Sequence, residues 1–201
     1  MKIGIDFGIT HTDVAITNDK GTNFQTFKSL KINQDLKCVF DSIQDPQNIK
    51  KIFVTGGKSS DLPETFNGLP VSHKNEIDSI ALGAKQLYDL KESALIVSTG
   101  TGTACVHFDG VNGSHMGGIG VGGGMLCGLG SLLFNNGDAL EIDEFAEKGD
   151  KSKIDFLIGD VVNQIGNLSP EITAANFGKA VNSESATLEN VAASLCNMIG
   201  E

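Results

Sequence analysis

Hydrophobic and polar residues alternate along the first 28 positions of the chain, in short runs rich in β-branched residues. Three such runs, at 2–6, 13–18 and 23–28, are separated by turn residues at 7–12 and 18–22. Period-two alternation over runs of this length is typical of half-buried strands. The sequence therefore predicts an antiparallel meander of three strands at the start of the chain.

A helix, a strand and a second helix are predicted after the meander. In residues 34–44 the apolar positions recur at helical spacing, and Asp45-Pro46 ends the segment. The run at 52–55 is typical of a strand that stops at Gly56-Gly57. Residues 75–90 give the clearest helical pattern, with one apolar face made by Ile77, Ile80, Ala81, Ala84 and Leu87.

The same order of strands and turns then recurs in the second half of the chain. The pattern predicts strands at 94–98, 104–108 and about 111–116, with a Gly/Thr turn at 99–103. A glycine-rich loop follows, then helices at about 123–134 and 138–147 and further segments at 154–163, 173–181 and 186–199, of which only 157–162 fits a strand. We interpret the recurrence as two lobes with one topology, residues 1–91 and 92–201.

Composition narrows the class of protein. The chain has 25 glycines in 201 residues, where about 7% is usual, and this excess is typical of close-approach loops around a ligand. The formal charge of −10 disfavours nucleic acid as a partner. All 15 basic residues are Lys, so an anion must be bound without the two-pronged contact that Arg provides.

The compartment is inferred from the cysteines and from the missing targeting signals. The four cysteines lack metal-ligand spacing, and we expect isolated buried thiols in a reducing compartment: Cys38, Cys105, Cys127 and Cys196. The N-terminus does not fit a signal peptide, and no apolar run is long enough for a membrane span. We therefore expect a cytoplasmic protein without a membrane partner.

The first candidate site is the turn that closes the first predicted strand. Its backbone N–H groups are suited to cradle a phosphate, and the Asp6 carboxylate is suited to hold a hydrated magnesium ion. An ordinary hairpin turn is the alternative. The turn consists of Asp6, Phe7, Gly8, Ile9 and Thr10.

Two further glycine-rich segments strengthen the case for a phosphate site. Gly100, Thr101 and Gly102 occupy the equivalent turn of the second lobe, and two such turns facing one cleft would clamp a polyphosphate. Residues 117–124 contain six glycines and open a helix, whose N-terminus favours an anion. The alternative for the turn is an ordinary hairpin, and the alternative for residues 117–124 is a flexible linker.

Several stretches resemble the type II pantothenate kinases, in the superfamily of acetate and sugar kinases, heat-shock chaperones and actin. They follow the family's order through nearly the whole chain, and the triple-glycine loop and TAANFG are specific to this family. The matching stretches are IGIDFGIT at 3–10, VTGG at 54–57, NEIDSIALGAKQL at 75–87, STGTGTACVHFDG at 98–110, GGIGVGGGMLCGLGSLL at 117–133 and TAANFGKA at 173–180.

The resemblance implies a two-lobed α/β fold of the actin-like ATPase, ribonuclease H-like type, with ATP and magnesium as cofactors. It implies that Glu76, shortly after a strand end near His73, is the general base, whereas a helix-start carboxylate is the alternative. Asp78 is expected to be solvated. The nucleotide would lie over the two turns and the residues Gly122, Gly123, Gly124, Met125, Leu126 and Cys127.

Three features depart from the family pattern. Ile9 replaces a second glycine of the first turn, and Asp13 stands where the family has a Lys. His115, beside Ser114 and Gly117, stands where the family's Arg grips the pantothenate carboxylate, and imidazoles are in general only partly charged at pH 7. The family also continues beyond the equivalent of Glu201, so the second lobe would be incomplete. The alternatives are that the chain is a fragment, that a partner supplies the rest, or that the protein is a decayed homologue.

The leading hypothesis is an ATP-dependent kinase that phosphorylates pantothenate, or a close analogue, for coenzyme A biosynthesis. The alternative is a catalytically impaired homologue that binds a nucleotide or acyl-CoA and acts as a regulator or in a heteromer. A sugar kinase or chaperone-type ATPase is a more distant possibility. The resemblance also implies a homodimer. An apolar stripe at the end of the chain, which we expect to be exposed, is compatible with a dimer. Feedback by acyl-CoA is left open.

Overall fold

The computed structural model describes residues 1–57, 59–163, 166–182, 184 and 186–201. Their contacts divide the chain into two compact units, residues 1–98 with 104–118 and residues 99–103 with 119–201. The units do not coincide with the expected lobes, because the strands at 104–118 belong with the first unit. The division into lobes at 91/92 stays a prediction.

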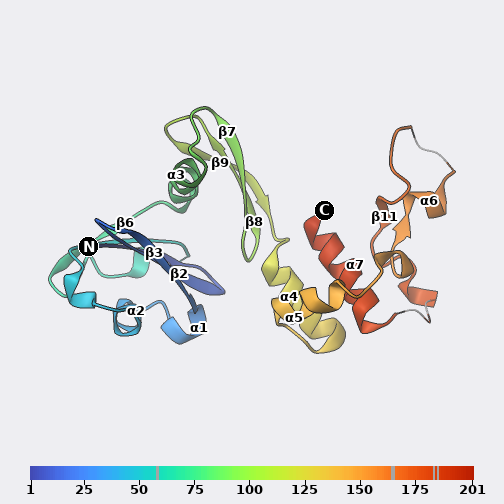
Figure 1. Ribbon diagram of the computed structural model, residues 1–201, viewed down its shortest axis with the longest axis horizontal. Coiled ribbons are helices and arrows are strands. Elements are labelled where there is room, and N and C mark those ends of the chain that lie inside the picture. The colour runs from blue at the N-terminus through green and yellow to red at the C-terminus, as the bar shows by residue number, and fades with distance from the viewer. Residues whose placement is uncertain (58, 164–165, 183, 185) are drawn as a thin grey trace. The chain divides into compact units, whose positions relative to one another are not determined.

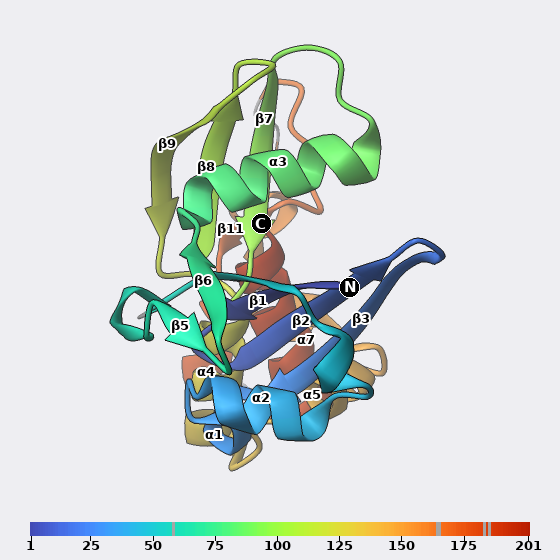
Figure 2. The same ribbon diagram turned by 90° about the vertical axis from the view of Figure 1, so that its left-hand side faces the viewer.

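The first unit contains a six-stranded sheet in the order β3-β2-β1-β4-β6-β5 (Figures 1 and 2). Strands β1 to β3 are antiparallel neighbours, which confirms the predicted meander, whereas β1, β4 and β6 are parallel. The strands are β1 (Lys2–Phe7), β2 (His11–Asn18), β3 (Gly21–Lys28), β4 (Lys51–Thr55), β5 (Thr65–Phe66) and β6 (Leu69–His73).

One face of this sheet is covered by short helices and carries the larger apolar core. Figure 2 shows α1 and α2 beneath the sheet, and Ile3, Ile5 and Val54 are buried against them. The helix predicted at 34–44 is confirmed as α2, and the aspartate at its N-cap accepts a hydrogen bond from Lys37 N at 2.8 Å. The covering elements are α1 (Ser29–Ile32), α2 (Leu36–Ser42), η1 (Pro46–Asn48) and η2 (Ser59–Asp61).

The remainder of the first unit is a helix packed on a separate three-stranded sheet, β7-β8-β9. Helix α3 (Glu76–Tyr88) buries Ala81 against Val106 and Phe108, but Leu87 of its predicted apolar face is 73% exposed. The sheet consists of β7 (Ala94–Thr99), β8 (Thr103–Phe108) and β9 (Gly113–Ile119), close to the predicted strands.

The second unit is mainly helical. Helix α7 packs on α4 and α5 and buries Ala192 and Leu195 completely. The expectation of an exposed stripe on the last helix is therefore wrong, because the apolar residues of α7 are covered within their own unit. The elements are α4 (Gly123–Phe134), α5 (Ala139–Ala146), η3 (Lys151–Lys153), β10 (Phe156–Leu157), α6 (Ile158–Val161), β11 (Thr173–Ala175), η4 (Ala180–Asn182) and α7 (Leu188–Gly200).

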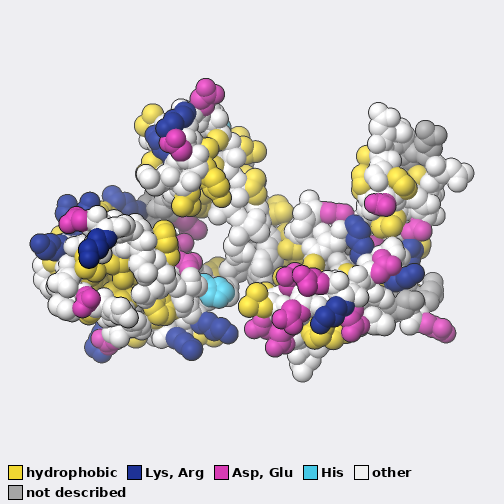
Figure 3. Space-filling model, in the orientation of Figure 1, with side chains coloured by type: hydrophobic (Ala, Val, Ile, Leu, Met, Phe, Trp, Pro, Cys, Tyr) yellow, Lys and Arg dark blue, Asp and Glu magenta, His cyan; other side chains and the backbone are white. Residues whose placement is uncertain are grey.

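The surface is uneven in charge and in polarity. Acidic side chains gather in the region of α5 on the face shown in Figure 3, and α5 carries the exposed residues Glu141, Asp143 and Glu144. Hydrophobic side chains are exposed on the sheet β7-β8-β9, where Leu95 and Val97 are more than half exposed. All four cysteines are free thiols, but each is partly exposed and not buried as expected.

Candidate functional site

The turn after β1 is held in place by the first residue of α1. Ser29 donates its hydroxyl to the Gly8 carbonyl at 2.7 Å and its N–H to the Thr10 carbonyl at 3.0 Å. A Cβ at Gly8 would lie 2.6 Å from the His11 carbonyl oxygen, so only glycine fits there. Ile9 is 78% exposed, and the turn therefore presents its tip to solvent from a fixed base.

A second glycine turn packs against this one from β4. Gly56 has φ +81°, and a Cβ there would overlap the Asp6 carboxylate. At Gly57 a Cβ would lie 2.9 Å from the Phe7 carbonyl oxygen. Since side chains at both positions would push the turns apart, the VTGG stretch brings two strand ends into contact at one edge of the parallel strands.

Carboxylates from β1, β2 and α3 influence one another electrostatically at this edge. Asp6 is the direct register partner of Asp13 on β2, and Glu76 begins α3. The pKa of Asp6 is raised above its ordinary value, first by partial burial and then by the negative charges of Glu76 and Asp13. Asp13 also accepts a hydrogen bond from the Thr26 hydroxyl at 2.5 Å. The arrangement concentrates negative charge beside the turn that follows β1.

Hard oxygen ligands of this kind suit magnesium, which keeps most of its water when it binds to one or two carboxylates. Among the residues that the structure describes, no three His, Cys, Asp or Glu side chains lie close enough together to hold a metal ion. The site therefore fits a hydrated ion that contacts Asp6 through water, and does not fit an all-protein metal cage.

Glu76 is exposed at the N-terminus of α3, which its neighbours fix. Asn75 caps the helix by accepting hydrogen bonds from Ile77 N and Asp78 N at 2.8 and 3.2 Å. Ser79 donates to the Thr55 hydroxyl at 3.4 Å and so ties the helix start to the end of β4. Asp78 is exposed, as expected. A carboxylate on a fixed helix start, close to Asp6, can take a proton from a bound hydroxyl.

In the second unit, the structure brings the Gly/Thr turn and the glycine loop together. Gly123 N donates to the Gly100 carbonyl at 2.8 Å, and Gly124 N donates to the Thr101 carbonyl at 2.9 Å. A Cβ at Gly122 would lie 2.8 Å from the Gly100 carbonyl oxygen. The glycines thus permit close packing of two backbones, and two N–H groups at the start of α4 are already used within the protein.

The remaining predicted residues lie on α4 and β9. Met125, Leu126 and Cys127 form the first turns of α4, directly after the glycine loop. Ser114, His115 and Gly117 lie on β9, where both side chains are exposed and Ser114 donates to the His107 carbonyl at 3.4 Å. The start of β9 packs on α3, since a Cβ at Gly113 would touch the Ala81 side chain.

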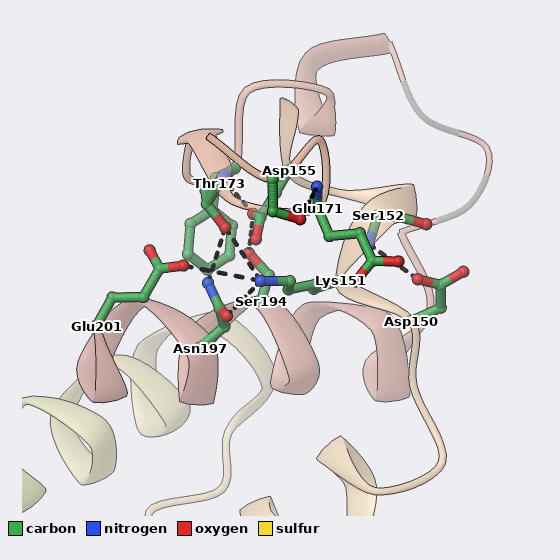
Figure 4. A network of polar contacts seen from close by, with 11 residues as sticks. Asp150, Lys151, Ser152, Asp155, Glu171, Thr173, Ser194, Asn197 and Glu201 are labelled. Carbon is green, nitrogen blue, oxygen red and sulfur yellow. Dashed lines mark hydrogen bonds and ion pairs between the residues drawn. The ribbon is translucent and has the colours of Figure 1, made fainter. Parts of the chain in front are cut away.

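The TAANFG segment is anchored to α7 through a buried carboxylate. Asp155 is fully buried and its Oδ1 accepts hydrogen bonds from Phe177 N at 2.8 Å and from the Ser194 hydroxyl. Lys151, nearby in Figure 4, donates to Asn197 Oδ1 at 2.6 Å and to the Thr173 hydroxyl at 3.3 Å. These contacts fix residues 173–180, for which the sequence alone suggested no anchor.

The sequence analysis missed a cavity beside Asp6. It has a volume of about 390 Å³ and lies on the face of the first sheet opposite α1 and α2, and Lys74, Thr55 and Ser79 are among its lining residues. Its shape depends on the register of four strands, which a one-dimensional pattern does not give.

In the described part of the chain no helix is long and apolar enough to cross a bilayer.

Comparison with known proteins identifies the family. Residues 89–201 match the Fumble family. The whole chain is 32% identical over 209 aligned residues to the type II pantothenate kinase of Staphylococcus aureus (strain USA300), of which it covers 76%. The chain belongs to the type II pantothenate kinase family. The family match and the identity to this relative therefore confirm the relationship that the sequence motifs indicated.

Solved structures confirm the fold of the homologue. It is similar to the activator of 2-hydroxyisocaproyl-CoA dehydratase from Clostridium difficile with bound ADPNP, with a TM-score of 0.57, 16% identity and coverage of 99% of this chain and 73% of the other. A putative 2-dehydro-3-deoxygalactonokinase from Sinorhizobium meliloti gives a TM-score of 0.51 at 10% identity, with coverage of 100% and 81%. These likenesses show the actin-like ATPase and sugar kinase fold.

Proposed function

We propose that this pantothenate kinase homologue transfers the γ-phosphoryl group of ATP to the hydroxyl group of pantothenate or a close analogue, as a step towards coenzyme A. Family membership supports an ATP-dependent phosphotransferase. The observation that carries the proposal is the glycine-braced turn at the end of β1, where Asp6 lies in reach of the negative charge of Glu76, which contributes to the raised pKa of the Asp6 carboxyl.

In this proposal Glu76 accepts the proton of the substrate hydroxyl while the hydroxyl oxygen attacks the γ-phosphorus of ATP. ADP then leaves with the electron pair of the broken bond. Phosphoryl transfer depends chiefly on positioning and on neutralising charge. Magnesium would supply positive charge near Asp6 and offset the repulsion between the phosphates and Asp13. The turn at Gly8 to Thr10 and the loop at Gly122 to Gly124 would hold the nucleotide.

The substrate residues stay proposals as well. His115 and Ser114 are exposed on β9, and with the Gly117 backbone they are suited to meet a polar group of the substrate. A homodimer and feedback by acyl-CoA belong to the same proposal. The covered apolar residues of α7 do not support a dimer through that helix, so a dimer would use another surface.

A catalytically impaired, nucleotide- or acyl-CoA-binding homologue is the second candidate function. The observation that favours it is the direct pairing of Asp13 with Asp6, which puts a second negative charge where phosphates would bind. The two candidates differ in one property, which is turnover in the presence of bound ATP.

The purified chain incubated with ATP, magnesium and either pantothenate or pantetheine tests the proposal. ADP release and the mass of the product report transfer, and calorimetry reports binding of ATP. We expect a product heavier by one phosphoryl group. Binding of ATP without any product from either compound contradicts the kinase function and favours the impaired homologue.

A further inference from the structure

The open face of the first sheet, opposite α1 and α2, carries its side chains in rows that the strand register defines. Ile3, Ile5 and Val54 are buried in the core, so the alternate residues of β1 and β4 point to the open face. The middle row has two small residues between two phenylalanines. It crosses β4, β1, β2 and β3 and consists of Phe53, Gly4, Ala15 and Phe24.

The middle row forms a groove with a phenylalanine on each side. Phe53 and Phe24 stand on β4 and β3, three strand spacings or about 14 Å apart, and Gly4 and Ala15 form the floor between them. Phe24 is 70% exposed, and a Cβ at Gly4 would have no neighbour within 4 Å. All four residues line the cavity of about 390 Å³. The groove is therefore wide enough for one α-helix, which is about 10 Å across with its side chains.

Opposite charges lie at the two ends of the groove. The acidic row, on one side of the middle row, contains the register partners Asp6 and Asp13. The basic row, on the other side, contains the register partners Lys2 and Lys51. Lys2 and Asp6 are four positions apart on β1, which is about 13 Å along the strand. All four side chains are exposed, and among the described residues no ion pair uses any of them.

An α-helix matches the groove in shape and in polarity. Its backbone groups are paired within the helix, so it can lie on a sheet face, where no backbone partners are offered. Its N-terminus carries partial positive charge and its C-terminus partial negative charge, the reverse of the two charged rows. About nine helical residues span the distance between these rows. A helix of this length turns two or three apolar side chains, spaced three or four residues apart, towards the floor.

We propose that the groove is the docking site for one amphipathic helix of a partner chain, with the helix N-terminus at the acidic row and its C-terminus at the basic row. Apolar side chains of the helix fill the space above Gly4 and Ala15. Lys74 extends the wall on β4, since its Nζ lies 5.6 Å from the centre of the Phe53 ring. Docking does not depend on phosphoryl transfer, but Asp6 also belongs to the candidate active site, so the partner's helix begins beside that site.

The first experiment tests the polarity with two synthetic peptides of identical composition, zero net charge and blocked termini. Both have leucines at helical spacing. The first has lysines in its first turn and glutamates in its last turn, and the second has the reverse order. Acidic residues at the N-terminus stabilise an isolated helix, so helicity alone favours the second peptide. We expect the first to bind the chain about 10-fold more tightly in calorimetry, because both of its ends meet opposite charges. Equal affinities, or no binding of either peptide, overturn the proposal.

The second experiment changes the walls and the floor of the groove. Phe24→Ser removes an exposed wall, and we expect the affinity for the first peptide to fall about 10-fold or more, as for a lost aromatic anchor. Leu30→Ser is the matched control, because Leu30 is 96% exposed on α1, which covers the other face. Gly4→Val fills the floor with a β-branched residue that suits a strand, and binding should fall there too. Urea unfolding reports whether each variant keeps its sheet. Equal losses in Phe24→Ser and Leu30→Ser overturn the groove as the binding site.

The third experiment tests the orientation and the identity of the partner. Asp13→Asn and Lys51→Gln should each reduce the preference for the first peptide, whereas Asp19→Asn, in the turn between β2 and β3, should leave it unchanged. An unchanged preference in Asp13→Asn and Lys51→Gln contradicts the proposed orientation. Sedimentation velocity of the chain alone tests a second copy, and a dimer that Phe24→Ser dissociates but Leu30→Ser does not would overturn a partner chain. The kinase assay contains no peptide, so docking and phosphoryl transfer are decided separately.

Discussion

Asp6 of β1 lies directly opposite Asp13 of β2 in the antiparallel register, and their carboxylates share the open face of the sheet. Like charges in such cross-strand pairs destabilise a sheet. Partial burial, Glu76 and Asp13, in that order, raise the pKa of Asp6 above its ordinary value of 3.8. The pair therefore costs stability, and a divalent cation bound beside it would offset that cost.

The first prediction concerns the pH dependence of this cost. A carboxyl group with a raised pKa in the folded state favours folding when it is protonated, and that contribution is lost as the pH rises through the folded-state pKa. Asp13→Asn removes one cause of the shift and keeps an acceptor for Thr26. We expect about 0.2–1 kcal/mol more stability at neutral pH and no difference below about pH 3.5.

Urea unfolding of both proteins at the two pH values measures this effect. Asp19→Asn, in the turn between β2 and β3, serves as the control for a change in net charge. A gain of the same size at both pH values would mean that repulsion between Asp6 and Asp13 is not its cause. Magnesium should reduce the gain at neutral pH, because the ion screens the same pair.

The second prediction tests the role of Glu76. Glu76→Gln keeps the size of the side chain but cannot accept the substrate proton, so kcat should fall about 10²- to 10⁴-fold. Nucleotide affinity should stay within a few-fold, because this group acts only in the transition state. Asp78→Asn, also in the exposed first turn of α3, is the matched control. Equal losses of kcat in both variants would show that Glu76 only stabilises the start of the helix.

Local sequence signals predicted much of the fold. The meander, α2 and α4 follow from alternation, helical spacing and glycine or proline boundaries. Strands β5 and β6 were missed, although a strand end was placed near His73, because both are short and Pro70 disfavours a strand assignment. The apolar stripe of α7 was found, but periodicity does not reveal whether other helices of the chain cover a stripe.

Part of the candidate site could likewise be predicted from the sequence, and part could not. Gly8, Gly122 and Gly124 were identified as residues that let the backbone approach a phosphate, which stays a prediction, and the structure shows each in close approach to a backbone carbonyl of the chain itself. The cavity beside Asp6 has no sequence signal, since its walls depend on which residues the strand register places beside Phe53. That the two glycine turns face one cleft stays a prediction.

The third prediction concerns the anchor of the TAANFG segment. Ser194 and Asp155 are both fully buried and hydrogen-bonded, so Ser194→Ala leaves a buried carboxylate with one donor fewer. We expect a loss of about 1–3 kcal/mol in the free energy of unfolding. Urea unfolding of a double-mutant cycle with Asp155→Asn isolates this contact, and additive losses would contradict a direct interaction.

The last prediction tests the glycine loop by two substitutions in one helix. A Cβ at Gly124 would lie 2.5 Å from Thr101 Cγ2 and 2.8 Å from the Thr101 carbonyl oxygen, whereas a Cβ at Gly128 has no neighbour within 4 Å. Gly124→Ala must displace the loop from the Gly/Thr turn, and we expect the affinity for ATP to fall at least about 10-fold, since each 1.4 kcal/mol is a factor of ten. Gly128→Ala should bind ATP as the wild type does and gain about 0.5–1 kcal/mol of stability, because alanine restricts the unfolded chain more than glycine. Calorimetry with ATP and urea unfolding measure the two effects separately. Wild-type affinity in Gly124→Ala would show that the close packing of these two backbones does not shape a nucleotide site.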